Sequence, residues 1–484
     1  MHSDIFPSYR GVMEYVCQGC QGRYPAEELH YTCPHCDSVF LLENTAFGEL
    51  AEKSPQEWRA LFDARRAGKN PALQGVFLFY ELVAPIIDEQ DVVWLGEGQT
   101  PIIEARTSLR RLVGQPLAFK NEGQNPSGSF KDRGMACAFS YLQAMIRKYG
   151  WNEVLTVCAS TGDTSASAAM YAAYVEGPVT SAVLLPRDRV TPQQLAQPLG
   201  SGAMVLELPG VFDDCMQVVE HLADHYHVAL LNSKNSWRIL GQETFAYEVA
   251  QWYGWDMAGK AVFVPIGNAG NISAVLSGFL KLAELRIIER LPKILGVQSS
   301  HADPIFRYYA QDEAGRHYEP VQVAPSVAQA AMIGNPVSFP RVTSLVERYE
   351  ARAGRGSFAV VQVEEQEIIE GMLLANARGH IACTQGGECL AGLIRARQDG
   401  LLEADETAIL DATAHSLKFL GFQQAYFDRT LSPEYEIKPR EEQINRPQAV
   451  LVDESLPAQG QADFIARAAE EVVRLLSLRD REME

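Results

Sequence analysis

From about Val92 to Leu431 the chain alternates between short β-branched runs and longer amphipathic stretches. The runs have the length of buried strands, and the stretches repeat apolar residues every three to four positions, as helices do. The expected strands are Val154–Val157, Val179–Leu185, Val228–Leu231, Ala261–Pro265, Ile294–Val297 and Phe358–Val363. The expected helices are Ser165–Val175, Phe212–His227, Arg238–Tyr253, Ile272–Ile288, Glu365–Ala377 and Glu388–Gln398. This alternation predicts an α/β fold with two open, mostly parallel sheets flanked by helices.

The same pattern predicts how the chain divides into domains. We expect a ribbon-like segment at 1–45, a helical region at 46–92, a large α/β domain at 93–138 and 236–445, a smaller inserted α/β domain at 139–235, and a tail with a helix at 446–484. The tail helix is expected at Gln459–Arg481, with an apolar face that packs on the core or on a partner chain.

Composition narrows the class of protein. The 484 residues are 47% apolar and 21% charged, as in ordinary globular proteins, and the net charge is −19. Such a charge disfavours nucleic acid or an anionic membrane as the main partner. We find neither a signal-peptide pattern nor an apolar run long enough to span a bilayer, and we therefore expect a cytoplasmic protein.

Four of the nine cysteines are clustered near the N-terminus, as Cys17-x-x-Cys20 and Cys33-x-x-Cys36. Two such pairs a dozen residues apart suit four thiolates around one tetrahedral structural zinc, as in a zinc ribbon. The alternative is redox-active or vestigial thiols. A unit this small has little core of its own, so a metal would contribute much of its folding energy.

A lysine lies in a Gly/Ser-rich turn within Asn125–Gly134, and apolar residues then recur at helical spacing up to Gly150. Lys131 is therefore expected at a helix N-terminus, where the partial positive charge lowers the pKa of its amine. A neutral lysine amine is what Schiff-base chemistry requires. The alternative is a solvated Lys-Asp-Arg run at the start of a helix.

Polar loops follow several of the expected strands, where ligands of open α/β sheets bind. Ser160–Ser165 offers hydroxyls and backbone N–H groups that could bind a carboxylate; the alternative is that these residues only cap a helix. Gly267–Asn271 could bind a phosphate through its backbone N–H groups; the alternative is an ordinary tight turn. A second phosphate could bind to Asn232, Ser233 and Arg238; the alternative is a surface arginine beside a turn. Thr413 could present its hydroxyl to a ligand after the last core strand; the alternative is that it caps a helix.

Taken together, these stretches resemble the pyridoxal-phosphate (PLP) enzymes of fold type II, with the architecture of the tryptophan synthase β chain, and within them the threonine synthase family, nearer its plant-type branch. The resemblance extends from Leu95 to about Gly421. The stretches that carry it are Asn125–Gly134, Ala159–Ser165, Asn232–Gln242, Pro265–Asn271 and Ala412–Phe419.

The resemblance implies a role for each matching position. Lys131 would form the Schiff base with PLP, Thr413 would hydrogen-bond the pyridine nitrogen, and Asp163 would lie near the ring hydroxyl. The cofactor phosphate would lie among Gly267, Asn268, Ala269, Gly270 and Asn271. The substrate carboxylate would be held by Ser160, Thr161 and Thr164, and the substrate phosphate by Asn232, Ser233 and Arg238.

The resemblance also implies a reaction, in which O-phospho-L-homoserine and water give L-threonine and phosphate, and a homodimeric assembly. Three alternatives remain open. The first is a sister enzyme such as cysteate synthase, which replaces the phosphate of O-phosphoserine. The second is a threonine or serine dehydratase, which needs no second phosphate site. The third is an inactive relative that serves as a binding module. Thr384–Gly387 departs from the plant pattern and receives no role, and the long N-terminal region linked to S-adenosylmethionine activation has no clear match.

Overall fold

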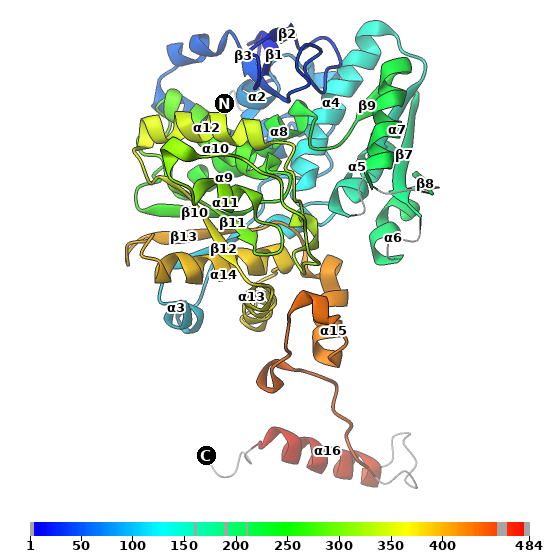
Figure 1. Cartoon of the computed structure of the whole chain (residues 1–484), viewed down its shortest axis with the longest axis vertical. Coiled ribbons are helices and arrows are strands. Elements are labelled where there is room, and N and C mark those ends of the chain that lie inside the picture. Colours follow the sequence, from blue (N-terminus) through cyan, green and yellow to red (C-terminus); the bar gives the residue numbers. More distant parts are fainter. Residues whose placement is uncertain (1–3, 159–161, 188–191, 210–211, 453–461, 479–484) are drawn as a thin grey trace. The chain divides into compact units, whose positions relative to one another are not determined.

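The computed structural model describes residues 4–158, 162–187, 192–209, 212–452 and 462–478 (Figure 1). The chain divides into two compact units. The first comprises Met1–Gln423 and Leu431–Ile437, and the second comprises Gln424–Thr430 and Lys438–Glu484. The candidate site lies in the first unit, and each unit is described by itself.

The larger sheet of the first unit has the strand order β12-β11-β10-β13-β5-β4. Its strands are β4 (Ile102–Glu104), β5 (Leu117–Asn121), β10 (Lys260–Pro265), β11 (Lys293–Ser299), β12 (Phe358–Val363) and β13 (Thr407–Ala412). All pairs are parallel except β4 with β5. The central strands β10 and β13 are almost entirely buried, which requires helices on both faces.

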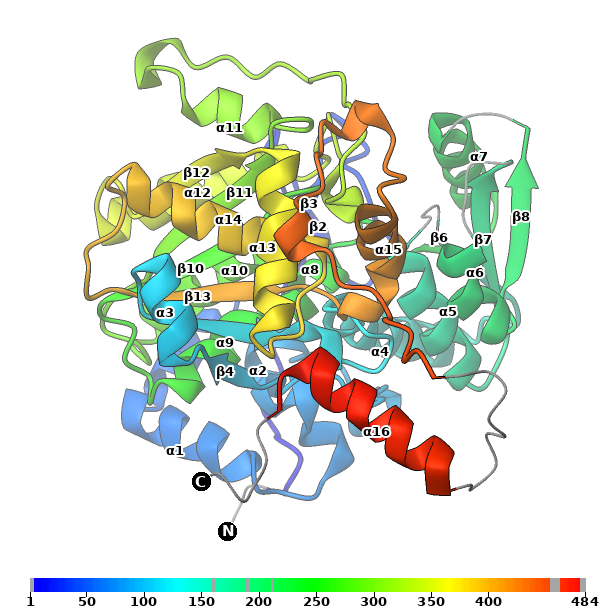
Figure 2. The same ribbon diagram turned by 90° about the horizontal axis from the view of Figure 1, so that it is seen from below.

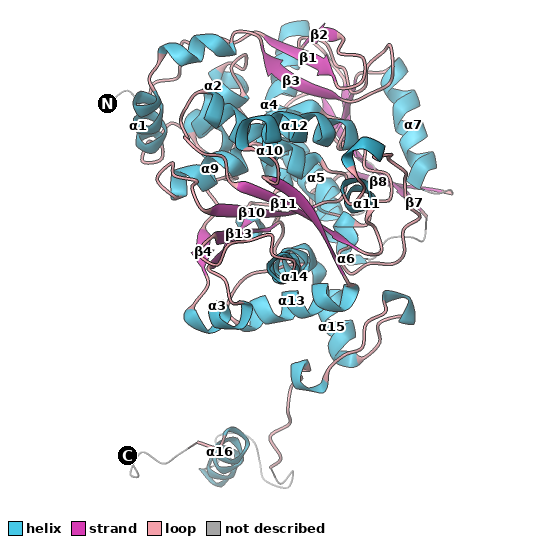
Figure 3. Cartoon of the chain, turned by 60° about the vertical axis from the view of Figure 1, so that its left-hand side comes forward, coloured by secondary structure: helices cyan, strands magenta, loops and turns pink. Residues whose placement is uncertain are grey.

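Helices cover the two faces of this sheet, as Figure 3 shows. On one side lie α9 (Thr244–Trp252), α10 (Gly270–Glu284) and α12 (Phe339–Ala353), and on the other lie α3 (Thr107–Val113), α13 (Glu365–Ala377) and α14 (Thr384–Gln398). The short α11 (Pro304–Tyr309) contacts β11 and β12. A large apolar core joins α4 (Lys131–Tyr149), α8 (Ser236–Gln242), α9 and α10 to the N-terminal elements.

The smaller sheet is fully parallel, in the order β8-β7-β6-β9. Its strands are β6 (Val154–Cys158), β7 (Val179–Pro186), β8 (Met204–Leu208) and β9 (Val228–Leu230). The helices α5 (Asp163–Tyr174), α6 (Pro192–Gly200) and α7 (Phe212–His225) alternate with these strands (Figure 2). This sheet lies within the expected inserted segment, while the domain boundaries themselves stay predictions.

The N-terminal segment forms an antiparallel sheet in the order β2-β1-β3, which we call the ribbon (residues 13–44). Its strands are β1 (Met13–Cys17), β2 (Arg23–Pro25) and β3 (Phe40–Asn44). The helices α1 (Pro55–Arg65) and α2 (Tyr80–Val83) follow, with a buried apolar stretch at residues 75–79 between them. The cysteine-containing segment near the N-terminus therefore forms a small sheet of its own.

The predicted fold class is confirmed, and the differences from the expected elements are local. The helix expected over Arg238–Tyr253 is two helices, α8 and α9, which meet at Glu243. The carboxylate of Glu243 accepts hydrogen bonds from Lys281 and Tyr247, which fixes the junction against α10. In the two larger sheets, the strands β4, β5 and β8 were not expected. The edge strands β4 and β8 are short and most of their residues are exposed, so the pattern of apolar residues is weak there. Strand β5 is buried, but it has no β-branched residue and ends in Lys120 and Asn121.

In the second unit, α16 (Ala462–Leu476) lies inside the expected tail helix. None of its described residues is buried, and the packing of its apolar face on the core or on a partner chain stays a prediction. The helix α15 (Leu420–Asp428) begins in the first unit and ends in the second. Within the described residues, no helix has the length and apolar character needed to cross a bilayer.

Candidate active site

Lys131 is the first residue of α4 and follows a tight turn. Gly128 adopts a φ of 84° in that turn, which favours glycine, and the carboxylate of Asp132 accepts a hydrogen bond from the Ser127 N–H at 2.7 Å. The Phe130 N–H donates to the Thr413 carbonyl at 2.9 Å. The loop that carries the lysine is therefore fixed at both ends before the helix begins.

The Lys-Asp-Arg run is not a solvated helix start. Asp132 and Arg133 are fully buried, and Arg133 forms ion pairs with Glu122 at 2.7 Å and Glu248 at 2.6 Å. A buried guanidinium with two carboxylate partners anchors the first turn of α4 in the core. Arg133 thus has a structural role.

The amine of Lys131 is only partly accessible and lies 3.8 Å from the centre of the Phe130 ring. Burial, followed by the positive charge of Arg238, lowers its pKa to about 8, while the charges of Asp163 and Asp411 act in the opposite direction. The expected lowering is confirmed. Its main cause is burial rather than the helix N-terminus from which we predicted it.

The charge of Arg238 acts on Lys131, and the two helices that carry these residues pack with their backbones in contact. A Cβ atom at Gly134 of α4 would lie 2.8 Å from the Arg238 carbonyl oxygen, and one at Gly241 of α8 would lie 2.2 Å from the Arg133 carbonyl oxygen. Only glycine fits at either position. Gly134 is therefore part of the lysine motif because it admits the helix that carries the arginine.

The guanidinium of Arg238 is buried with few partners. Its Nη1 donates to the Leu231 carbonyl at 3.2 Å, while Nε has no hydrogen-bond partner among the described residues. Burial lowers its pKa to about 10. A buried cation without a carboxylate at ion-pair distance in the described part of the chain is suited to an anionic ligand. Asn232 and Ser233 precede it in the loop after β9.

The loop Gly267–Asn271 runs from β10 to α10 and lies against another backbone segment. A Cβ at Gly267 would lie 2.9 Å from the Ala331 Cα, and Ala269 adopts a left-handed φ of 61°. Asn271 Nδ2 donates to Asp411 Oδ2 at 2.7 Å. Burial, followed by the charge of Glu122, raises the pKa of Asp411 to about 8. The loop is therefore a tight turn packed against a neighbouring backbone, and it is tied to the end of β13.

Thr413 is buried, and its hydroxyl lies 3.5 Å from the Cys383 thiol. Burial raises the pKa of Cys383 to about 11, so both groups are neutral at neutral pH. Ser129 pairs with Ala414 in an antiparallel bridge. The lysine loop and the threonine loop are thus held side by side, although nearly three hundred residues separate them.

The hydroxyl-rich loop is described only in part. Ser160 and Thr161 lie outside the described residues, while Asp163 and Thr164 begin α5. Asp163 is buried and pairs with Lys418, whose Nζ lies 3.1 Å from Oδ1. Lys418 also donates to the Ser127 carbonyl at 2.9 Å and to Gln197 Oε1 at 2.7 Å.

Lys418, Cys383 and Asp411 were missed by the sequence analysis as site residues. Lys418 belongs to the stretch Ala412–Phe419 that carried the resemblance, so a signal was present for it. No local pattern marks Cys383 or Asp411, because their relation to Thr413 and Asn271 arises from the sheet order.

The four ribbon cysteines converge, with all Sγ atoms within 4.8 Å of one another. Cys17 and Cys36 are 3.4 Å apart, and Cys20 and Cys33 are 3.6 Å apart. Tetrahedral Zn–S bonds of about 2.3 Å place sulfur atoms about 3.8 Å apart. The arrangement therefore fits a single zinc ion.

Comparison with known proteins shows the family to which the chain belongs. Residues 93–411 match the family described as pyridoxal-phosphate dependent enzyme. The chain is 34% identical over 406 residues to the threonine synthase of Methanocaldococcus jannaschii, covering 83% of this chain and 92% of that one. It is 33% identical over 387 residues to the chloroplastic threonine synthase 2 of Arabidopsis thaliana, and the match covers 80% of this chain and 73% of that one. The structure of yeast threonine synthase shares the fold, with a TM-score of 0.59 and 17% sequence identity; the match covers 90% of this chain and 94% of that one.

Proposed function

The chain belongs to the threonine synthase family of pyridoxal-phosphate-dependent enzymes, and on that premise we propose that it converts O-phospho-L-homoserine and water to L-threonine and phosphate. The observation that carries the proposal is the buried guanidinium of Arg238, whose Nε has no partner among the described residues, on a helix packed against the one that begins at Lys131. A dehydratase acting on threonine or serine has no use for a second buried cation at this position, whereas a phosphorylated substrate does.

The residues of the site fit the cofactor. Lys131 has an amine with a pKa near neutrality, as Schiff-base chemistry requires. The loop Gly267–Asn271 has the backbone shape for a phosphate, and Thr413 with Cys383 offers neutral groups to the pyridine nitrogen. We assign these residues to PLP, and Asp163 to the region of the ring hydroxyl. The bound cofactor would supply an electron sink for the substrate carbon atoms.

The protein's own groups bind the substrate and move protons. With substrate in the site, the free amine of Lys131 would act as a general base: it takes the proton from Cα, releases it to the departing phosphate, and then takes one from Cβ. As phosphate leaves Cγ, Lys131 returns the Cβ proton to Cγ. Water then adds with its hydroxide at Cβ, and its proton passes through Lys131 to Cα. A pKa of about 8 lets one amine both accept and release these protons near neutral pH.

Two anion sites would orient the substrate. We assign Asn232, Ser233 and Arg238 to its phosphate, and Ser160, Thr161 and Thr164 to its carboxylate. The phosphate assignment is supported by the buried guanidinium of Arg238. The carboxylate assignment is supported by the family resemblance and by the position of Thr164 at the start of α5.

Measuring phosphate release from O-phosphohomoserine, with identification of the amino-acid product, tests this function. We expect threonine with water as the only co-substrate. Release of phosphate from O-phosphoserine alone, and only with sulfite present, would instead identify the sister β-replacement activity. A protein that lacks a visible cofactor band and turns over neither ester would be the inactive binding module.

We also propose that the ribbon binds one structural zinc through Cys17, Cys20, Cys33 and Cys36, supported by the convergence of the four thiols. A homodimer and a cytoplasmic location remain predictions. Sedimentation of the purified protein tests the first, and fractionation of the source cells tests the second.

A further inference from the structure

Arg341 is fully buried on α12 and is surrounded by neutral acceptors. Its guanidinium donates to the Phe40 carbonyl at 2.6 Å, the Ser233 carbonyl at 2.8 Å, the Lys234 carbonyl at 2.9 Å, the Ser338 hydroxyl at 2.9 Å and the Ser236 hydroxyl at 3.3 Å. Within the described residues, no carboxylate lies at ion-pair distance from it. Its donors are satisfied, but its charge is not neutralised.

Burying a charge without a neutralising partner costs folding free energy, so we expect the buried Arg341 to have a function that offsets this cost. Burial, followed by the positive charge of Arg238, lowers the pKa of Arg341 to about 9. Two mutually repelling buried cations are stabilised together when an anion lies near them. The proposed substrate phosphate would be such an anion.

The acceptors of Arg341 belong to segments that are distant in sequence. Ser233 and Lys234 lie in the loop assigned to the substrate phosphate. Ser338 donates its backbone N–H to the Asn268 carbonyl at 3.2 Å, in the loop assigned to the cofactor phosphate. Phe40 lies in the ribbon strand β3. One side chain therefore connects both proposed phosphate loops to the ribbon.

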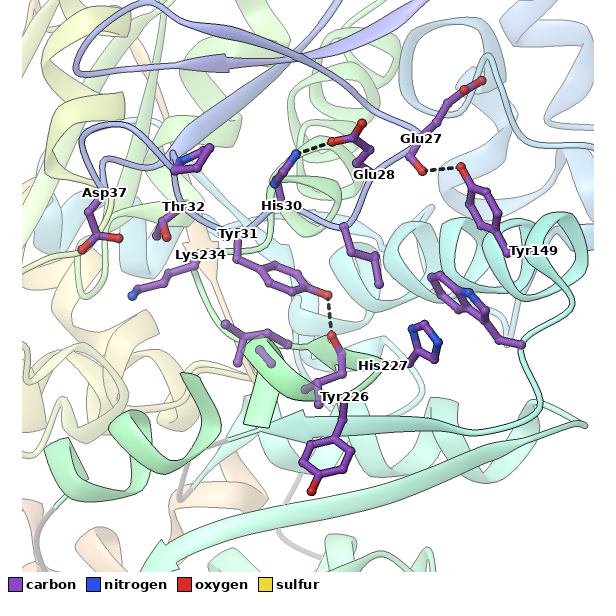
Figure 4. A pocket seen from close by; sticks show the side chains of 16 residues that line it. Glu27, Glu28, His30, Tyr31, Thr32, Asp37, Tyr149, Tyr226, His227 and Lys234 are labelled. Atoms are coloured by element: carbon purple, nitrogen blue, oxygen red, sulfur yellow. Dashed lines mark hydrogen bonds and ion pairs between the residues drawn. The ribbon is translucent and has the colours of Figure 1, made fainter. Parts of the chain in front are cut away.

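The ribbon makes further contacts with the elements on either side of the substrate-phosphate loop. The Ser236 hydroxyl donates to the same Phe40 carbonyl at 2.9 Å, and Trp237 Nε1 donates to the Tyr15 hydroxyl at 3.1 Å. On the other side of the loop, Tyr31 donates to the Val228 carbonyl of β9 at 3.2 Å, and both residues line the pocket shown in Figure 4. The ribbon thus contacts both the strand that precedes the loop Asn232–Asn235 and the helix that follows it.

We propose that Arg341 is a positioning residue that holds the substrate-phosphate loop and the cofactor-phosphate loop in register and couples both to the ribbon. It follows that the metal state of the ribbon sets the affinity of the site for phosphate, although no ribbon cysteine reaches the substrate. This inference rests on the proposed function, because it takes the loop Asn232–Asn235 as the phosphate site.

The first experiment compares Arg341→Met and Arg341→Lys with Arg348→Met. Arg348 lies on the same helix and also faces the ribbon, 3.9 Å from Glu43, but its side chain is half exposed. We expect Arg341→Met to raise KM for O-phosphohomoserine and the inhibition constant of inorganic phosphate together by ~10-fold or more, with a smaller change in kcat. Arg341→Lys should recover part of this loss, and the control should change neither constant.

A purely structural role would give a different result. In that case kcat, cofactor absorbance and melting temperature would fall together, with unchanged phosphate inhibition in the folded fraction, and the inference would be overturned. Should Arg341→Met fail to fold, Ser236→Ala removes one ribbon contact and one of the five acceptors of the guanidinium, while Arg341 itself is kept. We expect it to raise the same two constants, by a smaller factor.

The second experiment removes metal from the wild-type holoenzyme with a chelator and measures binding of inorganic phosphate by calorimetry. We expect weaker phosphate binding, restored by adding zinc, and little further effect of the chelator on Arg341→Met. Equal phosphate affinity with and without metal would refute the coupling. Because the probe is phosphate itself, this outcome is independent of whether the wild type makes threonine, which alone decides the proposed function.

Discussion

Lys418 Nζ lies 3.1 Å from Asp163 Oδ1, and this ion pair joins the loop after the last strand of the large sheet to the first turn of α5 beside the small sheet. The same ammonium donates to the Ser127 carbonyl in the lysine loop and to Gln197 on α6. Both side chains of the pair are largely buried. Lys418 therefore connects the two halves of the site around Lys131.

We expect Lys418→Met to lower kcat/KM by about 10- to 100-fold, because a hydrogen bond to a charged group contributes ~1.5–3 kcal/mol. Lys418→Arg should retain more activity than Lys418→Met. Steady-state kinetics with O-phosphohomoserine measure the effect, with exposed Lys69→Met as the control. Activity of Lys418→Met equal to that of the control would show that this connection does not position the site.

Lys131 should make the cofactor-free protein less stable at neutral pH than at high pH. Its pKa is about 8 when folded against 10.5 ordinarily, so between these values the unfolded chain binds more protons and stability rises with pH. Lys131→Met should therefore stabilise cofactor-free protein at pH 7 by ~1–3 kcal/mol, since the amine remains partly accessible, and by much less at pH 11. Urea unfolding at the two pH values measures this difference. A variant less stable than the wild type at pH 7 would contradict the burial of a charged amine.

Replacing Arg238 should change the choice of substrate. Arg238→Met removes the buried cation, and we expect kcat/KM for O-phosphohomoserine to fall about 10- to 100-fold. Dehydration of threonine, which presents no second anion, should change far less. Comparison of the two substrates on one enzyme preparation controls for loss of folded protein. Equal losses on both would show that the arginine is structural.

Thr413→Asp should increase side reactions. A carboxylate at this buried position would keep the pyridine nitrogen of the bound cofactor protonated and strengthen its electron sink, whereas the neutral hydroxyl does not. Product analysis and the visible spectrum measure the change, with Thr413→Ser as the matched control that retains a hydroxyl. An unchanged spectrum and product distribution in Thr413→Asp would argue against contact between residue 413 and the ring.

Cys17→Ser should lose the ribbon metal. Elemental analysis should find about one zinc per wild-type chain and substantially less in the variant. The variant should also unfold at lower temperature, because metal binding contributes folding energy to so small a unit. Cys215→Ser, a buried cysteine outside the cluster, is the control. Metal-free wild-type protein with all four thiols titratable would rule the site out.

Sequence alone determined the fold class and most of the elements, since hydrophobic periodicity is a local property that parallel sheets and their covering helices impose strongly. The cysteine spacing predicted the convergence of Cys17, Cys20, Cys33 and Cys36, because paired knuckles fix ligand geometry locally. The lysine turn and the glycine loop were likewise visible in short motifs. The edge strands β4 and β8 were not predicted because they are short and mostly exposed, and the buried β5 was not predicted because it has no β-branched residue.

Only the tertiary structure decided which groups share the site. The pKa of Lys131 depends chiefly on burial and on the charge of Arg238, whose helix packs closely against α4 because Gly134 and Gly241 let the two backbones touch. The pairing of Lys418 with Asp163, and the contacts of Arg341 with Phe40 and Ser233, join segments that are far apart along the chain. Such long-range contacts follow from strand order and helix packing, and no local pattern of residues specifies either.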